Sequence, residues 1–366
     1  MSRIALLEPY YTGSHKAWAD GLARFSRHDV RLLTLPGRFW KWRMHGGAVT
    51  LARRWLEAGL QADLIVATDM VDLTTFTSLT RESTASTPVA VYFHENQLTY
   101  PPPPGSKRDL HYGFINYASM LAADAVLFNS AFHREAWFAE LPRLLKHFPD
   151  FNELGSIDAL REKSTVLPLG MDLQRFNAHK DAPAGRVPTI VWNHRWEYDK
   201  QPEVFFEALY ALESAGIDFR VTVLGESFRQ RPEEFLRAQE RLHDRLVHFG
   251  YAQFSRYAHL LWQADIQVST AIQDFFGIST CEAIWCGCTP LLPNRLNYPA
   301  LIPEGLRTRH LYDDPNELVD RLKALCRTNT APDPLLAAHV RQFDWRESVG
   351  EYDRLFDSII QAHQWT

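Results

Sequence analysis

Two carboxylates, Asp274 and Glu282, stand in the second half of the chain with seven residues between them, among them Gly277. They follow a short apolar segment at 266–269 and accompany an apolar helical stretch. Because backbone N–H groups are unpaired at a helix N-terminus, a strand, a loop and a helix start together form a place for an anionic ligand. A carboxylate in such a loop suits sugar hydroxyls better than phosphate, and Glu282 lies one turn further on, where a ribose could bind. The alternative interpretation is a helix cap at Asp274 and a solvated Glu282.

Two cations, Arg195 and Lys200, follow an apolar segment earlier in the same half, before a helix expected to begin near Pro202. Arg presents a fork to two phosphate oxygens, and Lys adds a compact charge. Together they could neutralise a leaving diphosphate without a metal ion, and the chain contains no Asp-X-Asp motif. The alternative interpretation is two solvated surface cations.

Glycines lie at the ends of several predicted strands. Gly13 and Ser14 stand between the first strand and the first helix, where a close backbone approach and free N–H groups suit a diphosphate and Ser14 could cap the helix. Gly225, with Glu226, and Gly250 could contact a base or a ribose. Since the first loop is not G-x-G-x-x-G, a dehydrogenase is disfavoured. Ordinary turns would explain these glycines nearly as well.

Four polar residues, His94, Glu95, Asn96 and Gln97, follow a strand of the first half. Buried polar groups need partners, so this many are hard to bury together without a ligand. His94 is the best candidate to meet a donor sugar or an acceptor. The alternative interpretation is a capped surface loop.

Cations and indoles alternate at Arg38, Trp40, Lys41, Trp42 and Arg43, which we expect in a loop between a strand and a helix. Arg contacts phosphates and Trp stacks on unpaired bases, so the pattern is typical of an RNA contact. An aromatic hinge packed on its own domain is the alternative. Further cations could widen the patch or simply be solvated: Arg53, Arg54, Lys107 and Arg108.

Length and composition limit the possible classes. A chain of 366 residues suits two domains, and 46% hydrophobic residues suffice for sizeable cores. A net charge of −5 argues against nucleic-acid binding by bulk charge and leaves room for a local basic patch. With no signal peptide and no run of 18 apolar residues, we expect a cytoplasmic protein without stable membrane association. The cysteines lack the paired spacing of a zinc site, so we expect apolar packing residues in a reducing compartment, with metal binding a remote second: Cys281, Cys286, Cys288 and Cys326.

Short apolar strands alternate with helical segments along the whole chain, which predicts parallel sheets covered on both faces. The expected strands are 4–7, 30–35, 64–67, 89–93, 125–128 and 166–169 in the first half, and 189–192, 219–224, 246–249, 266–269 and 289–292 in the second. Residues 177–188 form the best linker candidate. We therefore expect an α/β protein of two doubly wound domains, 1–180 and 181–344, whose strand ends face a cleft. A C-terminal helix within 345–366 is expected to pack back on the first domain.

The Asp274-x7-Glu282 pair resembles the signature of family 4 glycosyltransferases with the GT-B fold, which has two Rossmann-like domains. Four segments are more specific: EPYYTGSH at 8–15, LPGRFWKWR at 35–43, FHENQ at 93–97 and WNHR at 192–195. They resemble the tRNA-queuosine alpha-mannosyltransferase family over nearly the whole chain. The resemblance implies GDP-mannose as donor and queuosine at the wobble position of tRNA-Asp as acceptor.

The resemblance also implies roles for the matched residues. Arg195 and Lys200 would stabilise the diphosphate, Asp274 would hold donor-sugar hydroxyls and His94 would lie near the reacting sugar. Asp274 stands where many related enzymes have Glu, and the shorter side chain alters the contacts to that sugar. The expected donor-binding residues are Gly13, Ser14, Gly225, Glu226, Gly250, Phe276, Gly277, Ile278 and Glu282. The expected acceptor-binding residues are His15, Arg38, Trp40, Lys41, Trp42, Arg43, Glu95, Asn96 and Gln97.

The expected activity is a retaining mannosyl transfer to tRNA that needs no metal ion and no other cofactor. Two alternatives remain: transfer to a lipid or small-molecule acceptor, and a non-catalytic RNA-binding protein with a relic sugar-nucleotide cleft. A basic amphipathic helix would favour the lipid acceptor, and no strong one is evident. The joint presence of the Arg195–Lys200 and Asp274–Glu282 pairs speaks against a relic cleft.

Overall fold

The computed structural model describes residues 1–103, 105–180, 187–225, 232–328 and 331–363. The chain forms two compact units. The first contains Met1–Asp172 together with Phe343–Thr366, and the second contains Leu173–Gln342. The sequence places these limits at 180 and 344 instead. Residues 181–186 of the predicted linker lie outside the described part of the chain.

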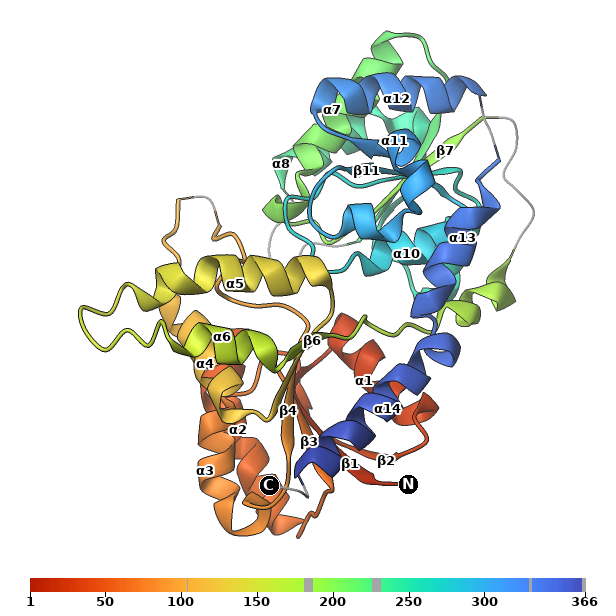
Figure 1. Cartoon of the computed structure of the whole chain (residues 1–366). Helices are drawn as coiled ribbons and strands as arrows, with labels where there is room; N and C mark the ends of the chain where they lie inside the picture. The colour runs from red at the N-terminus through yellow and green to blue at the C-terminus, as the bar shows by residue number, and fades with distance from the viewer. Residues whose placement is uncertain (104, 181–186, 226–231, 329–330, 364–366) are drawn as a thin grey trace. The chain divides into compact units, whose positions relative to one another are not determined.

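The first unit is built on a six-stranded parallel sheet with the strand order β2-β1-β3-β4-β5-β6. Strands β3 and β4 are buried along their whole length, as their continuous apolar runs predict. Figure 1 shows α1 and α14 on one side of this sheet and α2 to α6 on the other. The elements are β1 (Arg3–Tyr11), α1 (Gly13–Phe25), β2 (Asp29–Pro36), α2 (Trp40–Glu57), β3 (Leu64–Thr68), α3 (Leu73–Thr84), β4 (Val89–Phe93), α4 (Leu110–Ala122), β5 (Ala125–Phe128), α5 (Ala131–Leu145), α6 (Ser156–Glu162), β6 (Ser164–Val166) and α14 (Trp345–His363).

The C-terminal helix α14 packs against α1 of the first unit. Trp18 Nε1 donates to Tyr352 Oη at 3.1 Å, and Asp353 Oδ1 accepts from Ser26 Oγ at 2.6 Å. Gly21 leaves room for the ring of Trp345, because a Cβ at residue 21 would lie 1.9 Å from its Nε1. These contacts tie the end of the chain to its beginning.

The second unit repeats the architecture with a parallel sheet in the order β12-β11-β10-β7-β8-β9. The predicted α/β class with two doubly wound sheets is confirmed. Only the two-residue β12 falls outside the strands expected from sequence, because it is too short to leave an apolar run. The elements are β7 (Thr189–Asn193), α7 (Pro202–Ser214), β8 (Arg220–Leu224), α8 (Glu233–Arg241), β9 (Leu246–Gly250), α9 (Phe254–Trp262), β10 (Ile266–Val268), α10 (Ile278–Trp285), β11 (Thr289–Pro293), α11 (Arg307–His310), β12 (Leu311–Tyr312), α12 (Pro315–Thr328) and α13 (Pro334–Val340).

The structure corrects the sequence-based assignment in two places. The predicted loop around Trp40 is the first turn of α2, which starts after Phe39 in the left-handed conformation (φ 53°). Each glycine in the next turn destabilises the helix by about 1 kcal/mol relative to alanine. The burial of Met44 and of its neighbours at helical spacing outweighs this cost. The strand expected at 166–169 ends at Val166 instead, and Pro168, two residues on, has no N–H group to donate to a sheet.

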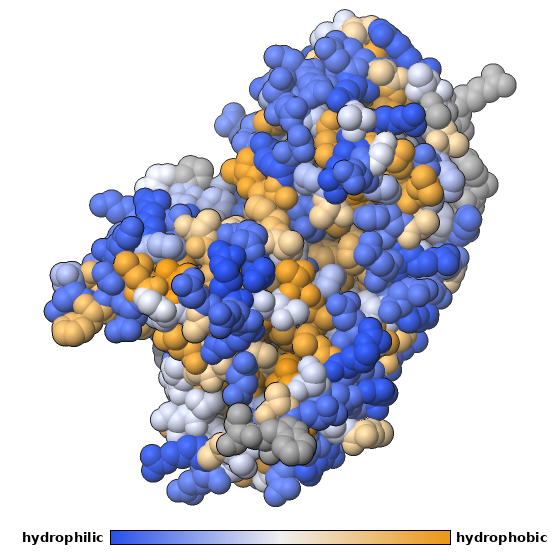
Figure 2. Space-filling view, viewed as in Figure 1, coloured by the Kyte–Doolittle hydropathy of each residue, from blue (hydrophilic) through white to orange (hydrophobic). Residues whose placement is uncertain are grey.

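The helices of the described residues fall short of what a bilayer crossing requires. Within the described residues, no helix combines the length and the apolar character needed to cross a bilayer. Figure 2 shows hydrophilic residues over much of the visible face, with hydrophobic residues gathered in small areas among them.

Candidate functional site

The loops after β7 and β10 bring Lys200 and Asp274 together in the second unit. Lys200 Nζ lies 3.8 Å from Asp274 Oδ2 and 3.3 Å from Asp199 Oδ2, and it also donates to the Gln273 carbonyl. Lys200 is buried, so the interpretation of two solvated cations is wrong for this residue. Arg195 lies in the same loop after β7 and is exposed. The pair therefore combines one cation braced inside the unit with one at its surface.

The Asp274 side chain is held in place before α10. Its Oδ1 accepts from Phe276 N at 3.3 Å and its Oδ2 accepts from Tyr298 Oη at 3.3 Å. Gly277, with φ 102°, is the residue that caps α10, so the alternative interpretation of Asp274 as a helix cap is wrong. A Cβ at Gly277 would lie 2.7 Å from Leu301 Cδ1, which adds a packing reason for glycine there. Gly277 and Ile278 thus set the start of α10, and the Asp274 carboxylate is held by Phe276 N, Tyr298 and Lys200 and does not cap the helix.

Glu282 lies inside α10 and is not solvated, since its side chain is 13% exposed. Tyr257 Oη donates to Glu282 Oε2 at 2.7 Å, and Arg175 Nη2 donates to Oε1 at 3.4 Å. Asn193 in turn donates to Tyr257 Oη at 3.2 Å and to the Ser279 carbonyl at 2.8 Å. Burial raises the pKa of Glu282 although both donors favour its charged form. These partners stand far from Glu282 along the chain, so the sequence carries no signal for them.

The glycines after β8 and β9 differ in role. A Cβ at Gly225 would lie 1.9 Å from the carbonyl oxygen of His194, so this glycine is required where two loops of the protein itself meet. Gly250 has φ 130°, and a Cβ at this residue would meet no other atom within 4 Å. Its carbonyl oxygen accepts a hydrogen bond from Gly225 N at 3.2 Å. Glu226 lies outside the described residues.

His194 is a buried residue of this region that the sequence analysis does not single out. Its Nδ1 lies 3.4 Å from Ser279 Oγ at the start of α10, and its Nε2 has no partner among the described residues. Burial lowers the pKa of His194 to about 3, so the ring is neutral. A neutral imidazole with a spare nitrogen can hydrogen-bond a ligand from this loop.

The first unit gathers Glu8, His15 and His94 into a buried cluster where β1 and β4 end. His15 Nδ1 lies 2.9 Å from Glu8 Oε2, and the His15 and His94 ring centroids are 4.4 Å apart. One ligand atom from each residue lies within 4.8 Å of the others, a set that could chemically hold a transition-metal ion. The Glu8 carboxylate already accepts from His15 and from Tyr10 N at 2.7 Å, so an internal ion pair uses the same atoms.

The charges within this cluster follow from burial. Burial alone would lower the pKa of His15, but the adjacent Glu8 carboxylate outweighs it and raises the pKa to about 9. Burial and the neighbouring His15 hold the pKa of His94 well below its usual range. Asp69 Oδ1 accepts from His94 N at 2.8 Å, and burial raises the pKa of Asp69 well above its ordinary value. Both ring nitrogens of His94 and Asp69 Oδ2 lack partners in the described part of the chain, which is rare for buried groups and indicates a ligand.

The rest of the polar loop after β4 has structural contacts. Asn96 Oδ1 accepts from Leu98 N and Thr99 N, at 3.0 and 2.7 Å, so the capped-loop interpretation fits this side chain. Gln97 Nε2 donates to Glu95 Oε1 at 2.9 Å, and both side chains are half-buried. Glu95 and Gln97 therefore remain the better candidates to meet an acceptor.

The loop before α1 differs from its prediction. Gly13, with φ 51°, is the first residue of α1 and Thr12 is its cap, so Ser14 lies within the first turn and does not cap the helix. The Thr12 side chain makes no capping hydrogen bond. The N–H groups of a first helical turn have no acceptor within the helix, and the contact of Gly13 and Ser14 with a diphosphate stays a prediction.

The predicted RNA-contacting residues divide at the start of α2. Trp40 packs in a small apolar cluster with Met44 and Tyr112, as the hinge interpretation expects. Arg43 Nε donates to the Pro36 carbonyl at 3.0 Å. The remaining three residues are exposed: Arg38, Lys41 and Trp42.

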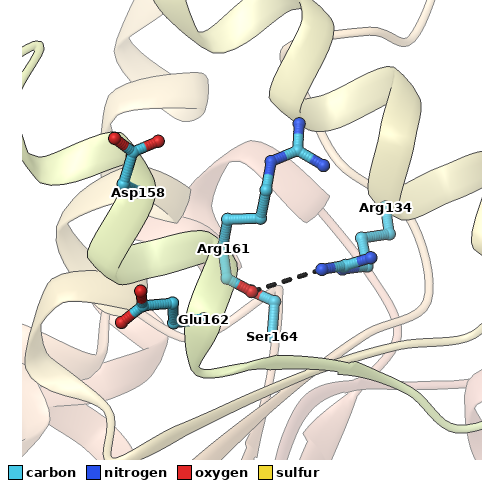
Figure 3. A pocket seen from close by; sticks show the side chains of 5 residues that line it. All are labelled: Arg134, Asp158, Arg161, Glu162 and Ser164. Atoms are coloured by element: carbon cyan, nitrogen blue, oxygen red, sulfur yellow. Dashed lines mark hydrogen bonds between the residues drawn. The ribbon is translucent and has the colours of Figure 1, made fainter.

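A separate hollow of about 470 Å³ lies between α5, α6 and β6 and is lined by none of the predicted site residues (Figure 3). Arg134 Nη2 donates to the Arg161 carbonyl at 3.3 Å, and both guanidinium groups pair with Glu135. Because Asp158 and Glu162 also line it, carboxylates balance its cations and it does not suit a phosphate.

Comparison with known proteins matches these two units to two family models. Residues 3–171 match the tRNA-queuosine alpha-mannosyltransferase N-terminal family, and residues 174–333 match the glycosyl transferases group 1 family. The chain is similar to the catalytic domain of starch synthase IV from Arabidopsis thaliana (TM-score 0.71, 11% identity, 98% of this chain and 99% of that one). It is also similar to sucrose-phosphate synthase from Thermosynechococcus elongatus (TM-score 0.70, 15% identity, 99% and 100%). At such identities the likeness establishes the GT-B fold alone.

A curated relative is more similar in sequence to this chain than these solved structures are. The tRNA-queuosine alpha-mannosyltransferase of Drosophila melanogaster is 35% identical over 333 residues, covering 88% of this chain and 87% of the relative. Both units are therefore related to that protein along most of their length, and the N-terminal family model matches the unit that carries the more specific motifs. This chain is a glycosyltransferase that belongs to the tRNA-queuosine alpha-mannosyltransferase family.

Proposed function

We propose that this enzyme transfers mannose from GDP-mannose to queuosine at the wobble position of tRNA-Asp, with retention of configuration at the sugar. The observation that carries the proposal is the braced carboxylate pair of the second unit. Asp274 lies beside Lys200, and Glu282 is held by Tyr257 and Arg175. The relative is named for mannosyl transfer to tRNA queuosine, which supports the same acceptor here.

Each donor-site residue has a distinct task in this proposal. Arg195 and Lys200 neutralise the leaving diphosphate, since charge-assisted contacts in a water-poor site are strong. Asp274 accepts hydrogen bonds from donor-sugar hydroxyls, and Glu282 accepts them from the ribose. In the first unit, the N–H groups at Gly13 contact phosphate.

The transfer itself requires no protein nucleophile. The acceptor hydroxyl oxygen bonds to the anomeric carbon on the face from which the diphosphate leaves, while the bond between that carbon and the diphosphate oxygen breaks. The hydroxyl proton passes to the departing phosphate oxygen, and GDP is released. Catalysis comes from positioning and from charge stabilisation. His94 is neutral, both its ring nitrogens lack partners among the described residues, and it orients a hydroxyl of the reacting sugar.

The test is incubation of the protein with GDP-mannose and total tRNA, followed by mass spectrometry of the digested nucleosides. We expect one hexose to be added to queuosine, and none when the tRNA comes from cells that lack queuosine. UDP-glucose in place of GDP-mannose serves as the donor control and should give no product. Hexose transfer to lipid or to free glycosides, with the tRNA unmodified, would contradict the proposed acceptor.

A further inference from the structure

Two large aromatic side chains are exposed at the start of α2. Phe39 is 77% exposed and Trp42 is 64% exposed. Residues 38–43, which contain these rings, include three cations and no Asp or Glu: Arg38, Lys41 and Arg43. Exposed aromatic rings among charges of one sign are unusual on a surface without a binding role. The sign of the charge is complementary to a polyanion.

The indole of Trp42 is laid against its own helix by Gly46, one turn further on. A Cβ at residue 46 would lie 2.7 Å from Cζ2 and 2.8 Å from Cε2 of Trp42. Glycine in a helix costs about 1 kcal/mol relative to alanine, so Gly46 is locally unfavourable and sterically required by this ring position. The neighbouring Gly47 has a separate explanation, because its Cβ would meet Pro9 at 3.0 Å. One side of the Trp42 ring packs on its own helix, and the side chain is 64% exposed. The ring is therefore a flat surface open to solvent.

The other side chains of this turn support the platform. Trp40 is packed inward, and the Lys41 ammonium lies 5.6 Å from the centre of its ring. Arg43 is braced on the Pro36 carbonyl. Arg38 and Lys41 are exposed and can reach phosphates on either side of a bound base.

We propose that Trp42, with Phe39 at the cap of the same helical turn, is a stacking platform for unpaired bases of the acceptor RNA, and that Arg38 and Lys41 contact the flanking phosphates. The inference rests on the proposed function only in taking RNA as the acceptor. Every base has an aromatic face, so stacking binds a single-stranded loop regardless of its sequence, and nearby cations hold the backbone. In double-helical RNA the bases are already stacked on one another and offer no free aromatic face. The platform therefore suits the unpaired bases of a loop.

The experiment measures binding of an anticodon stem-loop RNA with 2-aminopurine in its loop, by anisotropy and by quenching, at several salt concentrations and without GDP-mannose. Trp42→Ala should weaken binding roughly tenfold to hundredfold and abolish part of the quenching, with the salt slope unchanged. The double variant Arg38→Ala/Lys41→Ala should weaken binding and reduce the salt slope by about one to two units. Gly46→Ala keeps the indole but displaces it, so it should weaken RNA binding without lowering the melting temperature.

Val49→Ala is the matched control, because Val49 is a 52% exposed apolar residue of the same helix and should leave RNA affinity unchanged. Unchanged affinity in Trp42→Ala, or a loss of GDP binding in place of RNA binding, would overturn the platform. A loss equal to that of Val49→Ala would also overturn it, since the effect would then be general to the helix. Because binding is measured without donor, normal RNA binding with no sugar transfer would contradict only the proposed function.

Discussion

The carboxylates Asp274 and Glu282 of the second unit and the His94–Asp69 pair of the first unit are held in different ways. In the second unit, Glu282 has Tyr257 and Arg175 as partners, and Asp274 lies beside Lys200. In the first unit, the Glu8–His15 pair adjoins His94 and Asp69, which keep unpartnered atoms within the described residues. Side chains already held by hydrogen bonds can bind a ligand without reorganising. Buried polar groups without partners gain the most free energy when a ligand supplies the missing hydrogen bonds. If the second unit binds the donor as proposed, its carboxylates are preorganised for it, whereas His94 and Asp69 would gain partners only from a ligand.

The largest effect is expected from Arg195→Ala, which removes the exposed cation and leaves the braced one. Losing one charge-assisted contact to the leaving diphosphate should cost ~3 kcal/mol, a fall in kcat of about a hundredfold or more. The melting temperature should change little, because Arg195 is exposed. Lys200→Ala should lose activity to a similar extent and also lower the melting temperature, since it leaves Asp199 and Asp274 without their cation. Arg327→Ala, an exposed cation on α12, is the control. Near-normal kcat in both site variants at saturating donor would refute the assignment.

Glu8→Gln tests how much the first unit depends on the buried Glu8–His15 ion pair. Because the pKa of His15 is raised to about 9, the pair stabilises the fold fully below the ordinary histidine pKa of about 6.5. This stabilisation is lost as the pH rises through 9. The variant should therefore be less stable by ~3 kcal/mol at pH 6, and the difference should shrink by pH 9.5.

Thermal denaturation across that pH range measures the difference. Asp20→Asn is the matched control, because it breaks the exposed Lys16–Asp20 pair on α1 and should change stability by less than about 1 kcal/mol. A stability loss in Glu8→Gln that does not vary with pH would show that His15 is not the group involved.

A smaller effect is expected from Glu282→Gln, which keeps the shape and removes the charge. A carboxylate that accepts hydrogen bonds from ribose hydroxyls should contribute more binding free energy than the neutral amide. The Kd for GDP should therefore rise about tenfold. Tyr257→Phe removes the donor that orients Glu282 and should weaken GDP binding less. Calorimetric titration with GDP gives both values. Equal affinity in the wild type and in Glu282→Gln would remove Glu282 from the ribose contacts.

The smallest effect is expected from chelation. With two cations assigned to the diphosphate and the Glu8 carboxylate already paired with His15, EDTA should leave the transfer rate unchanged. The measurement compares initial rates before and after EDTA treatment, then after adding Mg²⁺, Mn²⁺ or Zn²⁺. If chelation stopped turnover and a metal ion restored it, the metal-free assignment would be wrong, and Glu8, His15 and His94 would be the first ligands to consider.

Much of the fold could be predicted because its signals are local. Apolar runs such as those of β3 and β4 mark buried parallel strands, and the apolar spacing after Trp345 marks α14. The prediction failed at Trp40, because tertiary burial extends α2 through two glycines that local propensity would exclude. It also failed at Ser14, because α1 begins at the left-handed Gly13 with Thr12 as its cap, two residues earlier than a cap at Ser14 would place it. Both misses occurred at element ends, where long-range packing competes with weak local preferences.

The sequence by itself determined the order of elements, the α/β class and the motifs that relate this chain to its family, since all of these lie in short continuous segments. Only the tertiary structure decided that Lys200 is buried beside Asp274 and that Tyr257 and Arg175 hold Glu282. It alone separated Trp42, open to solvent, from Trp40, which is half-buried against the cluster of Met44 and Tyr112. Partners brought together across distant parts of the chain leave no local pattern, because burial and pairing depend on which elements the fold places side by side.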